Sequence, residues 1–388
     1  MRAEKNHAKI VLGSATPSVE TYARAKKGIY SLFEMKQRIN GKPLPYCEVV
    51  DMGNESRSGN YSLMSRRMKQ RLQETLDKKE QAMILLNKRG YASFIKCESC
   101  NEPIRCPHCD VTLTYHKAEN RLKCHLCEYF IPTPRTCPNC GSMHLKKIGY
   151  GTQKIEEELE KQYPEAHIIR FDFDTTRNKN THLKLLKDFE EHKADIMLGT
   201  QMIAKGLDFS NVTFVGVLMA DLSLMVPDFR ASERTFQLLC QVAGRSGRGE
   251  KQGTVMIQTF NPEHYAIKAA VKQDYDSFFK EEIAFRKKAK YPPYCHLVSV
   301  IVQSRSPKNV HSIALDISQY LKDHLEKVRI IGPQSTFKMQ DIYRERILIK
   351  YIESKPIYEQ LSIIDDYYNR TRKGGVIVAC DFNPYSTY

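Results

Sequence analysis

The sequence lacks any long apolar run. Its apolar segments are short and β-branched, and none approaches the roughly 20 residues that a membrane-spanning helix needs. The N-terminus shows no basic stretch followed by an apolar one, so nothing in it predicts secretion. A membrane protein is therefore excluded as an interpretation, and we expect a cytoplasmic location.

The sequence also lacks the two motifs with which most ATP-driven enzymes hold nucleotide. No Gly-x-x-x-x-Gly-Lys-[Ser/Thr] loop occurs, and no acidic box for Mg²⁺ is recognisable. The segment Asp188–His192 (Asp-Phe-Glu-Glu-His) resembles such a box, but it has an extra residue and lies late in an amphipathic helix. We interpret it as a solvated helix face, and we expect that this chain alone does not hydrolyse ATP.

Acidic residues are fewer than basic ones. The 388 residues hold 60 Lys and Arg against 45 Asp and Glu, a formal net charge of +15. Such an excess favours polyanionic partners, because each neutralised phosphate releases counterions. A basic surface with no partner explains the charge equally well, so the charge supports nucleic-acid binding without establishing it.

Cysteine, in contrast, is concentrated. Eight of the 12 cysteines form four Cys-x-x-Cys pairs within one short stretch. Two thiolates three residues apart on a tight turn point at one position, and two such pairs complete a tetrahedral Zn²⁺ site. The sequence therefore predicts two structural zinc ions, and the spacing alone leaves three ways of combining the pairs. The predicted ligands are Cys97, Cys100, Cys106, Cys109, Cys124, Cys127, Cys137 and Cys140.

Disulfides and redox chemistry are the alternatives for these pairs. In a reducing compartment clustered pairs are metal sites more often than disulfides, and redox proteins use one reactive pair on a helix. Eight thiols already satisfy two ions, so the neighbouring histidines are interpreted as bystanders: His108, His116 and His125. The remaining cysteines are interpreted as small buried apolar residues: Cys47, Cys240, Cys295 and Cys380.

Strands and helices alternate on both sides of the cysteines. Short continuous apolar strands are predicted at 82–86, 167–171, 195–199, 212–219 and 254–258, with helices at 64–78, 153–162, 183–192 and 233–242. This alternation indicates a parallel sheet covered on both faces, with the cysteine block as an insertion. A further strand is expected at Lys9–Leu12, a linker at 38–46 and a loop at 54–60. From about 290 onward, strands at 296–302, 346–351 and 376–379 and helices at 309–326 and 355–368 predict a small α+β domain.

Two motifs carry further chemistry. Gln241–Arg248 (Gln-Val-Ala-Gly-Arg-Ser-Gly-Arg) ends a helix with two arginines whose forks suit a phosphate. Leu198–Asp208 places Thr200 at the end of a strand, where its hydroxyl and backbone N–H can hold a phosphate. Each motif alone is also consistent with an ordinary polar loop.

Together with Gly13–Ser18 (Gly-Ser-Ala-Thr-Pro-Ser), these segments resemble motifs III, V and VI of superfamily 2 helicases. The cysteine block between Asn87–Tyr91 and Gly149–Gln153 narrows the resemblance to the PriA family of primosomal replication-restart helicases. The resemblance covers essentially the whole chain, including Asp228–Arg234 and Tyr291–Tyr294. It implies a RecA-like second helicase lobe with a two-zinc insert and a small C-terminal α+β domain.

The resemblance also implies roles for single residues. Arg245 and Arg248 would contact the γ-phosphate of ATP, with Arg248 as the arginine finger. Gly206, Asp208 and Gln241 would lie by the nucleotide. Contacts to DNA and its coupling to ATP would come from Ser14, Thr16, Thr200 and Gln201. The zinc pairing would be nested, with Cys97, Cys100, Cys137 and Cys140 on one ion and Cys106, Cys109, Cys124 and Cys127 on the other.

In the family, ATP and Mg²⁺ are bound by motifs that precede Gly13–Ser18, so we expect a C-terminal part of an ATP-dependent 3′→5′ DNA helicase. Expected partners are forked and single-stranded DNA, single-stranded-DNA-binding protein and other primosome proteins. The alternative is a non-enzymatic zinc-ribbon module that binds DNA or protein. The expected division is 1–36, a remnant of the first lobe; 37–80, a linker and entry helix; 81–96 with 148–288, the second lobe; 97–147, the zinc insert; and 289–388, the C-terminal domain.

Overall fold

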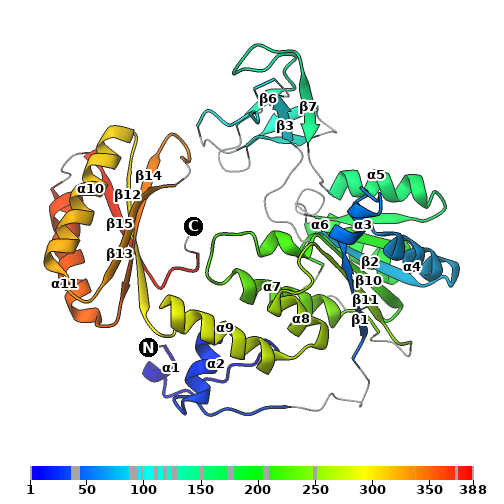
Figure 1. The fold of residues 1–388 in the computed structure, drawn as a ribbon, viewed down its shortest axis with the longest axis horizontal. Helices are drawn as coiled ribbons and strands as arrows, with labels where there is room; N and C mark the ends of the chain where they lie inside the picture. Colours follow the sequence, from blue (N-terminus) through cyan, green and yellow to red (C-terminus); the bar gives the residue numbers. More distant parts are fainter. Residues whose placement is uncertain are drawn as a thin grey trace.

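The computed structural model describes residues 2–35, 44–86, 94–97, 99–100, 102–108, 112–116, 120–124, 129–148, 152–172, 179–203, 209–247, 251–336, 338–371 and 375–386. Three bodies are visible: a lobe built on a parallel sheet, a small Cys-rich module and a C-terminal domain (Figure 1). In this described part of the chain, no helix combines the length and the apolar character that crossing a membrane requires.

The lobe is built on a six-stranded parallel sheet. Its strand order is β1-β11-β10-β2-β9-β8. The strands are β1 (Tyr46–Asp51), β2 (Gln81–Leu86), β8 (Ile168–Phe171), β9 (Ile196–Gly199), β10 (Val212–Leu218) and β11 (Thr254–Thr259). Every residue of β2, β9, β10 and β11 is buried. The predicted parallel sheet is confirmed.

Helices cover both faces of this sheet, because successive strand side chains point to opposite sides. Ile84 and Ala82 pack with α4 (Arg66–Asp77) and α5 (Thr152–Gln162), whereas Met83 and Leu85 belong to the core on the other face. That second face is covered by α6 (Lys179–Glu190), α7 (Ala231–Ala243), α8 (Tyr265–Lys272) and α9 (Tyr275–Ala289). The short helices are α1 (Arg2–Lys5), α2 (Val19–Lys26), α3 (Met52–Arg57) and η2 (Ala220–Ser223), and Val19 at the start of α2 packs in the core of the second face.

Three local expectations were wrong. Lys9–Leu12 forms no strand, and Val11 is 90% exposed, because no neighbouring strand pairs with its backbone groups. Tyr46–Asp51, expected within the linker and entry-helix segment 37–80, is instead the edge strand β1 and pairs with β11. The loop expected at 54–60 begins as α3, which Asp51 caps by accepting hydrogen bonds from the N–H groups of Gly53 and Asn54.

The Cys-rich module is inserted between β2 and α5. Strands β3 (Phe94–Cys97) and β7 (Leu145–Ile148) pair antiparallel at its base. A second antiparallel sheet consists of β4 (Thr114–His116), β5 (Arg121–Lys123) and β6 (Phe130–Pro132). Its apolar cluster is small and includes two cysteines, Cys106 and Cys124. The insertion that the sequence predicted is confirmed.

The C-terminal domain is a four-stranded antiparallel sheet covered by two helices. Its strand order is β13-β14-β12-β15. The strands are β12 (His296–Ser304), β13 (Arg329–Ser335), β14 (Tyr343–Tyr351) and β15 (Ile377–Phe382), and the helices are α10 (Pro307–His324) and α11 (Ser354–Asp365), the latter continued by η3 (Asp366–Arg370). The predicted α+β character is confirmed, and β13 is an additional strand.

Candidate functional site

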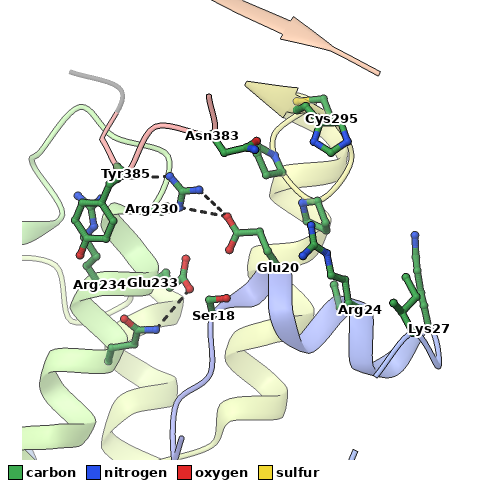
Figure 2. Close-up of a pocket in the computed structure, with 16 residues that line it drawn as sticks. Ser18, Glu20, Arg24, Lys27, Arg230, Glu233, Arg234, Cys295, Asn383 and Tyr385 are labelled. Carbon is green, nitrogen blue, oxygen red and sulfur yellow. Dashed lines mark hydrogen bonds and ion pairs between the residues drawn. The ribbon is translucent and has the colours of Figure 1, made fainter. Parts of the chain in front are cut away.

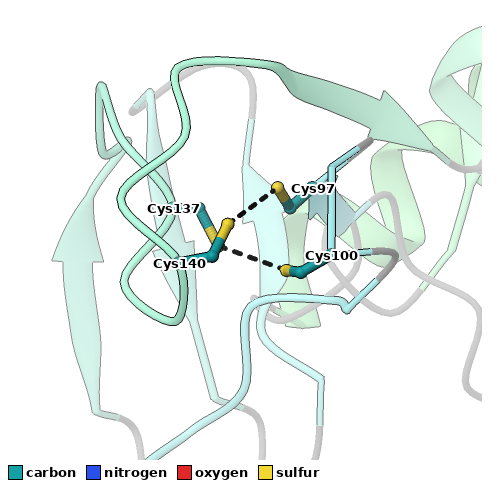
Figure 3. A group of neighbouring side chains, drawn as sticks. All are labelled: Cys97, Cys100, Cys137 and Cys140. Atoms are coloured by element: carbon teal, nitrogen blue, oxygen red, sulfur yellow. Dashed lines mark hydrogen bonds between the residues drawn. The ribbon is translucent and has the colours of Figure 1, made fainter.

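Four thiols of the Cys-rich module meet at one point (Figure 3). The Sγ atoms of Cys97, Cys100, Cys137 and Cys140 all lie within 4.8 Å of one another. Cys97 Sγ is 3.6 Å from Cys140 Sγ, and Cys100 Sγ is 3.7 Å from Cys137 Sγ. Tetrahedral zinc with Zn–S bonds of about 2.3 Å requires Sγ–Sγ separations of about 3.8 Å, so the donor set and its geometry fit a closed Zn²⁺ site.

Backbone N–H groups prepare these thiols to act as thiolates. The N–H of Cys100 donates to the Cys97 thiol and, with the N–H of Ser99, lowers its pKa to about 6. The pKa of Cys140 moves the other way: the Ser142 N–H lowers it, but burial and the three neighbouring thiols raise it to about 12. Thiols this close cannot all ionise cheaply together, and a divalent cation between them would remove that penalty.

Three of the cysteine turns are closed by the same backbone hydrogen bond, which runs from the N–H of the first cysteine to the carbonyl five residues later. The N–H of Cys97 donates to the carbonyl of Glu102 at 2.9 Å, and the N–H of Cys137 donates to that of Ser142 at 2.7 Å. Cys124 repeats this spacing of five residues, since its N–H donates to the carbonyl of Tyr129 at 2.7 Å. Cys106 and Cys124 are both buried in the module's apolar cluster, whereas Cys109 and Cys127 lie outside the described residues. The first half of each inner pair is thus buried within one cluster.

The helicase motifs occupy opposite edges of the parallel sheet. Thr200 and Gln201 follow the carboxyl end of β9. Arg245 lies just after α7, at the amino edge, because the N–H of Gly247 donates to the carbonyl of Val212, the first residue of β10. Since β10 has seven residues, these edges are about 23 Å apart. Residues 200–211 join β9 to β10, and Gly206 and Asp208 among them lie outside the described residues. Arg248, which follows Gly247, also lies outside the described residues.

Two features fix the backbone of the loop that carries Arg245: the hydrogen bonds of Ser246 and the close approach of Gly247 to Gly253. Ser246 is buried, and its hydroxyl lies 3.0 Å from the carbonyl of Thr213 and 3.2 Å from that of Thr254. Gly247 has φ +70°, and a Cβ there would stand 2.4 Å from the backbone nitrogen of Gly253. Both observations explain why serine and glycine follow this arginine: the backbone crosses the start of β11 too closely for a larger residue. Gln241, one turn earlier on α7, is exposed.

Ser14 and Thr16 lie along the same helix. Gln237 of α7 donates to the carbonyl of Thr16 at 3.2 Å, and the Thr16 N–H donates to the Ser14 hydroxyl at 3.1 Å. Val19 N–H donates to the Glu233 carboxylate at 3.0 Å. The segment is therefore attached to α7 between the two edges.

A buried ion cluster at the start of α7 was not visible in the sequence. Arg286 of α9 is fully buried and contacts Glu233 at 2.6 Å, Glu282 at 2.7 Å and Glu20 at 3.3 Å. Burial raises the pKa of Glu233 although Arg286 opposes the shift. Arg230 adds a contact to Glu20 at 2.9 Å. The cluster joins α2, α7 and α9, which lie far apart in the sequence, and α9 carries several other charged residues, so no local signal marked Glu282 and Arg286 as buried partners.

A cavity of about 680 Å³ opens beside this cluster, between α2, α7 and the C-terminal domain (Figure 2). Arg230 donates to the carbonyl of Pro384, and Arg234 stacks over the ring of Tyr385 at 4.6 Å. Because α7 is 13 residues long, Arg230 at its start lies about 20 Å from the Arg245 loop at the other end of that helix. The cavity therefore lies toward the start of α7, away from the Arg245 loop.

Three segments of the chain match known families in this order. Residues 106–132 match the PriA DNA helicase Cys-rich region domain, 146–250 the helicase conserved C-terminal domain and 287–385 the primosomal protein N C-terminal domain. Replication restart protein PriA of Bacillus subtilis (strain 168) is 47% identical over 388 residues, 99% of this chain. The chain belongs to the PriA family. PriA of Chlamydia pneumoniae is 41% identical over 93% of the chain.

The chain spans about half the length of these PriA relatives, 48% of the first and 49% of the second. Among solved structures, S. cerevisiae Dbp5 bound to RNA and ADP BeF3 aligns with 74% of this chain and 57% of its own, at 13% identity and a TM-score of 0.36. A TM-score this low supports no inference about this chain. The PriA assignment confirms the helicase family and the zinc-ribbon character of the Cys-rich module that the sequence predicted.

Proposed function

We propose that this chain contributes the second helicase lobe, the zinc insert and the C-terminal domain of an ATP-dependent 3′→5′ DNA helicase of replication restart. The observation that carries the proposal is the order of parts: a Cys-rich module inserted in a parallel helicase lobe, followed by the primosomal C-terminal domain. Residues 1–36 would belong with the first lobe, 81–96 with 148–288 would form the second lobe together with β1 and α4, 97–147 would be the zinc insert and 289–388 the C-terminal domain.

At the amino edge of the sheet, Arg245 and Arg248 would contact the γ-phosphate of ATP, which Mg²⁺ accompanies when bound. Gly206, Asp208 and Gln241 would lie beside the nucleotide, and the arginine forks would stabilise the charge that develops during phosphoryl transfer. At the carboxyl edge, Thr200 and Gln201 would hold the DNA backbone. The separation of the edges supports this division of roles, and Ser14 and Thr16, attached to α7, would couple them.

The Cys-rich module would bind two structural Zn²⁺ ions in the nested arrangement, and such thiolates suit a cytoplasmic location. The meeting of the outer four thiols supports the first ion, and the shared backbone closure at Cys124 supports the second. We propose forked and single-stranded DNA, single-stranded-DNA-binding protein and other primosome proteins as partners. The net charge of +15 is consistent with the DNA part of this proposal.

The purified chain tests the proposal in two measurements. Fluorescence anisotropy with a labelled fork should show binding that weakens at least tenfold between 50 and 200 mM salt, because phosphate contacts release counterions (roughly 10³–10⁵ for a full set of contacts). ATP turnover should stay at background with or without the fork, since no phosphate loop is present. No binding to the fork would contradict the DNA assignment, and DNA-stimulated turnover would contradict the predicted inactivity.

A further inference from the structure

The Cys-rich module contacts the C-terminal domain at one of that domain's hairpins. The hairpin is the tight turn Met339–Ile342, which joins β13 to β14 and is closed by two hydrogen bonds of 3.1 Å between Met339 and Ile342. Its two central residues, Gln340 and Asp341, have φ +53° and +60°. Positive φ at both positions is typical of a type I′ turn, which keeps the tip narrow and its N–H groups exposed.

The hairpin recognises the two residues between Cys106 and Cys109. The N–H of Asp341 donates to the carbonyl of His108 at 2.8 Å, and the Asp341 carboxylate lies 2.6 Å from Nδ1 of the His108 ring. The Lys338 ammonium donates to the carbonyl of Pro107 and lies 3.6 Å from Asp341. All these partners sit inside one Cys-x-x-Cys turn, and two of them are backbone carbonyls.

Apolar contacts extend the same interface. Met339 packs against the module's apolar cluster, which contains Cys106 and Cys124. The His108 ring lies edge-on to Tyr129 at 5.1 Å, and the carbonyl of Tyr129 closes the Cys124 turn. The hairpin therefore binds the Cys106 turn directly and, through Met339 and the His108 ring, adjoins the cluster that contains Cys124 and Tyr129.

Carbonyl positions inside a cysteine turn depend on the ion that the turn holds. A metal fixes the backbone between its ligands, and without it such turns lose their defined conformation. The carbonyls of Pro107 and His108 would then no longer face Lys338 and the Asp341 N–H. Loss of an inner ion would therefore weaken contact with the C-terminal domain.

We propose that Met339–Ile342 is a zinc-dependent latch, which attaches the C-terminal domain to the insert only while the inner cysteine set holds its ion. The lobe is joined to the insert by the chain and to the C-terminal domain by α9 and the Arg230 contacts (Figure 1). Closing the latch completes a ring of three bodies, and opening it frees the C-terminal domain from the insert. The latch rests on the proposed inner zinc site.

Hydrogen exchange on the full chain, with zinc content measured on the same samples, tests the latch. Cys124→Ser should lower the content from two Zn²⁺ to one and speed exchange of peptides covering 338–342 at least tenfold. Cys137→Ser, the matched outer variant, should also lower the content to one but leave those peptides protected. Protection that persists in Cys124→Ser, or that falls equally in Cys137→Ser, would overturn the latch. A wild-type content below two would instead contradict the inner site.

A second pair of variants separates the hairpin from the metal. Asp341→Asn keeps a residue that tolerates positive φ, and combined with Lys338→Glu it removes the attraction to His108 and Pro107. This double variant should keep two Zn²⁺ and still show at least tenfold faster exchange at 338–342. Lys355→Glu with Asp366→Asn, both in exposed positions of the same domain, is the control and should change neither quantity. Unchanged exchange in the double variant would also overturn the latch.

Discussion

The helicase lobe and the Cys-rich insert are stabilised in opposite ways. The lobe buries both faces of six parallel strands, and large side chains such as Phe214 and Phe236 are completely inaccessible. The insert offers three- and four-residue strands around a small cluster that includes cysteines. Small domains cannot bury enough apolar surface to offset chain entropy without disulfides or metals. One chain therefore contains a body that folds on apolar burial and one whose fold depends on ligands to an ion.

Zinc removal should have the largest effect, because the insert should lose its structure while the lobe keeps its own. A strong chelator should expose residues 94–148 to protease, and Cys137→Ser should expose only the outer turns around Cys97 and Cys137, while the lobe and the C-terminal domain stay resistant. Structural zinc contributes on the order of 10 kcal/mol to such modules, far more than the insert's apolar cluster can replace. Mass spectrometry of limited digests locates the cuts.

Cys47→Ser serves as the matched control for that experiment. Cys47 is half-buried on β1, and burial raises the pKa of its thiol to about 11, so it takes no part in the cluster. The zinc content and the protease digest of Cys47→Ser should match those of the wild type. Simultaneous loss of the lobe on chelation would contradict the independence of the two bodies.

The buried ion cluster around Arg286, in contrast, should make the stability of the lobe depend on pH. Arg286→Met leaves the carboxylates of Glu233, Glu282 and Glu20 without their buried cation, and it should destabilise the lobe by about 3–5 kcal/mol near pH 7. Burial already raises the pKa of Glu233, and loss of Arg286 raises it further. A carboxyl with a raised folded-state pKa favours folding below its unfolded pKa of about 4.3 and loses that contribution as pH rises.

The destabilisation by Arg286→Met should therefore be small at pH 4.5 and grow toward pH 7, as urea midpoints at the two pH values would show. Arg67→Met, which removes an exposed arginine that lies 3.3 Å from Glu48, should change stability little at either pH. A deficit that is independent of pH would contradict the role assigned to Glu233. Zinc content should be unaffected in both variants.

The smallest effect concerns one helix end in the lobe. Ser65 caps α4 by accepting a hydrogen bond of 3.0 Å from the N–H of Met68. Ser65→Ala should cost about 1 kcal/mol in urea unfolding of the lobe, whereas Ser65→Thr keeps the hydroxyl and should recover most of the loss. Equal losses in both variants would mean that packing around this buried residue, and not the cap, sets the cost.

Much of the lobe was predictable because its central strands are continuous apolar runs. The runs at 82–86, 195–199 and 212–219 appear as β2, β9 and β10 within a residue or two. The edge strand β1 was missed, since its sequence Tyr-Cys-Glu-Val-Val-Asp is half-exposed and follows a proline-containing segment. Lys9–Leu12 has the better strand composition but forms none. Composition alone does not supply the neighbour whose backbone a strand must pair with.

The candidate site also has a part that the sequence could indicate and a part that it could not. The types and spacing of Cys97, Cys100, Cys137 and Cys140 indicate a metal site directly, since ligands three residues apart are fixed by one turn. The proximity of the two pairs, 37 residues apart, depends on the pairing of β3 with β7. Arg286 and Glu233 are 53 residues apart, and nothing local marks them as partners.

The sequence by itself determined what depends on near neighbours along the chain: the alternation of strands and helices, the four cysteine turns and the motifs that resemble PriA. The tertiary structure decided what depends on distant segments meeting. It selected one of three cysteine pairings for the outer set, placed Thr200 and Arg245 at opposite edges of the sheet and brought Met339–Ile342 onto the Cys106 turn. The physical reason is that side-chain chemistry is fixed residue by residue, whereas proximity follows from strand pairing and core packing, which involve the whole chain at once.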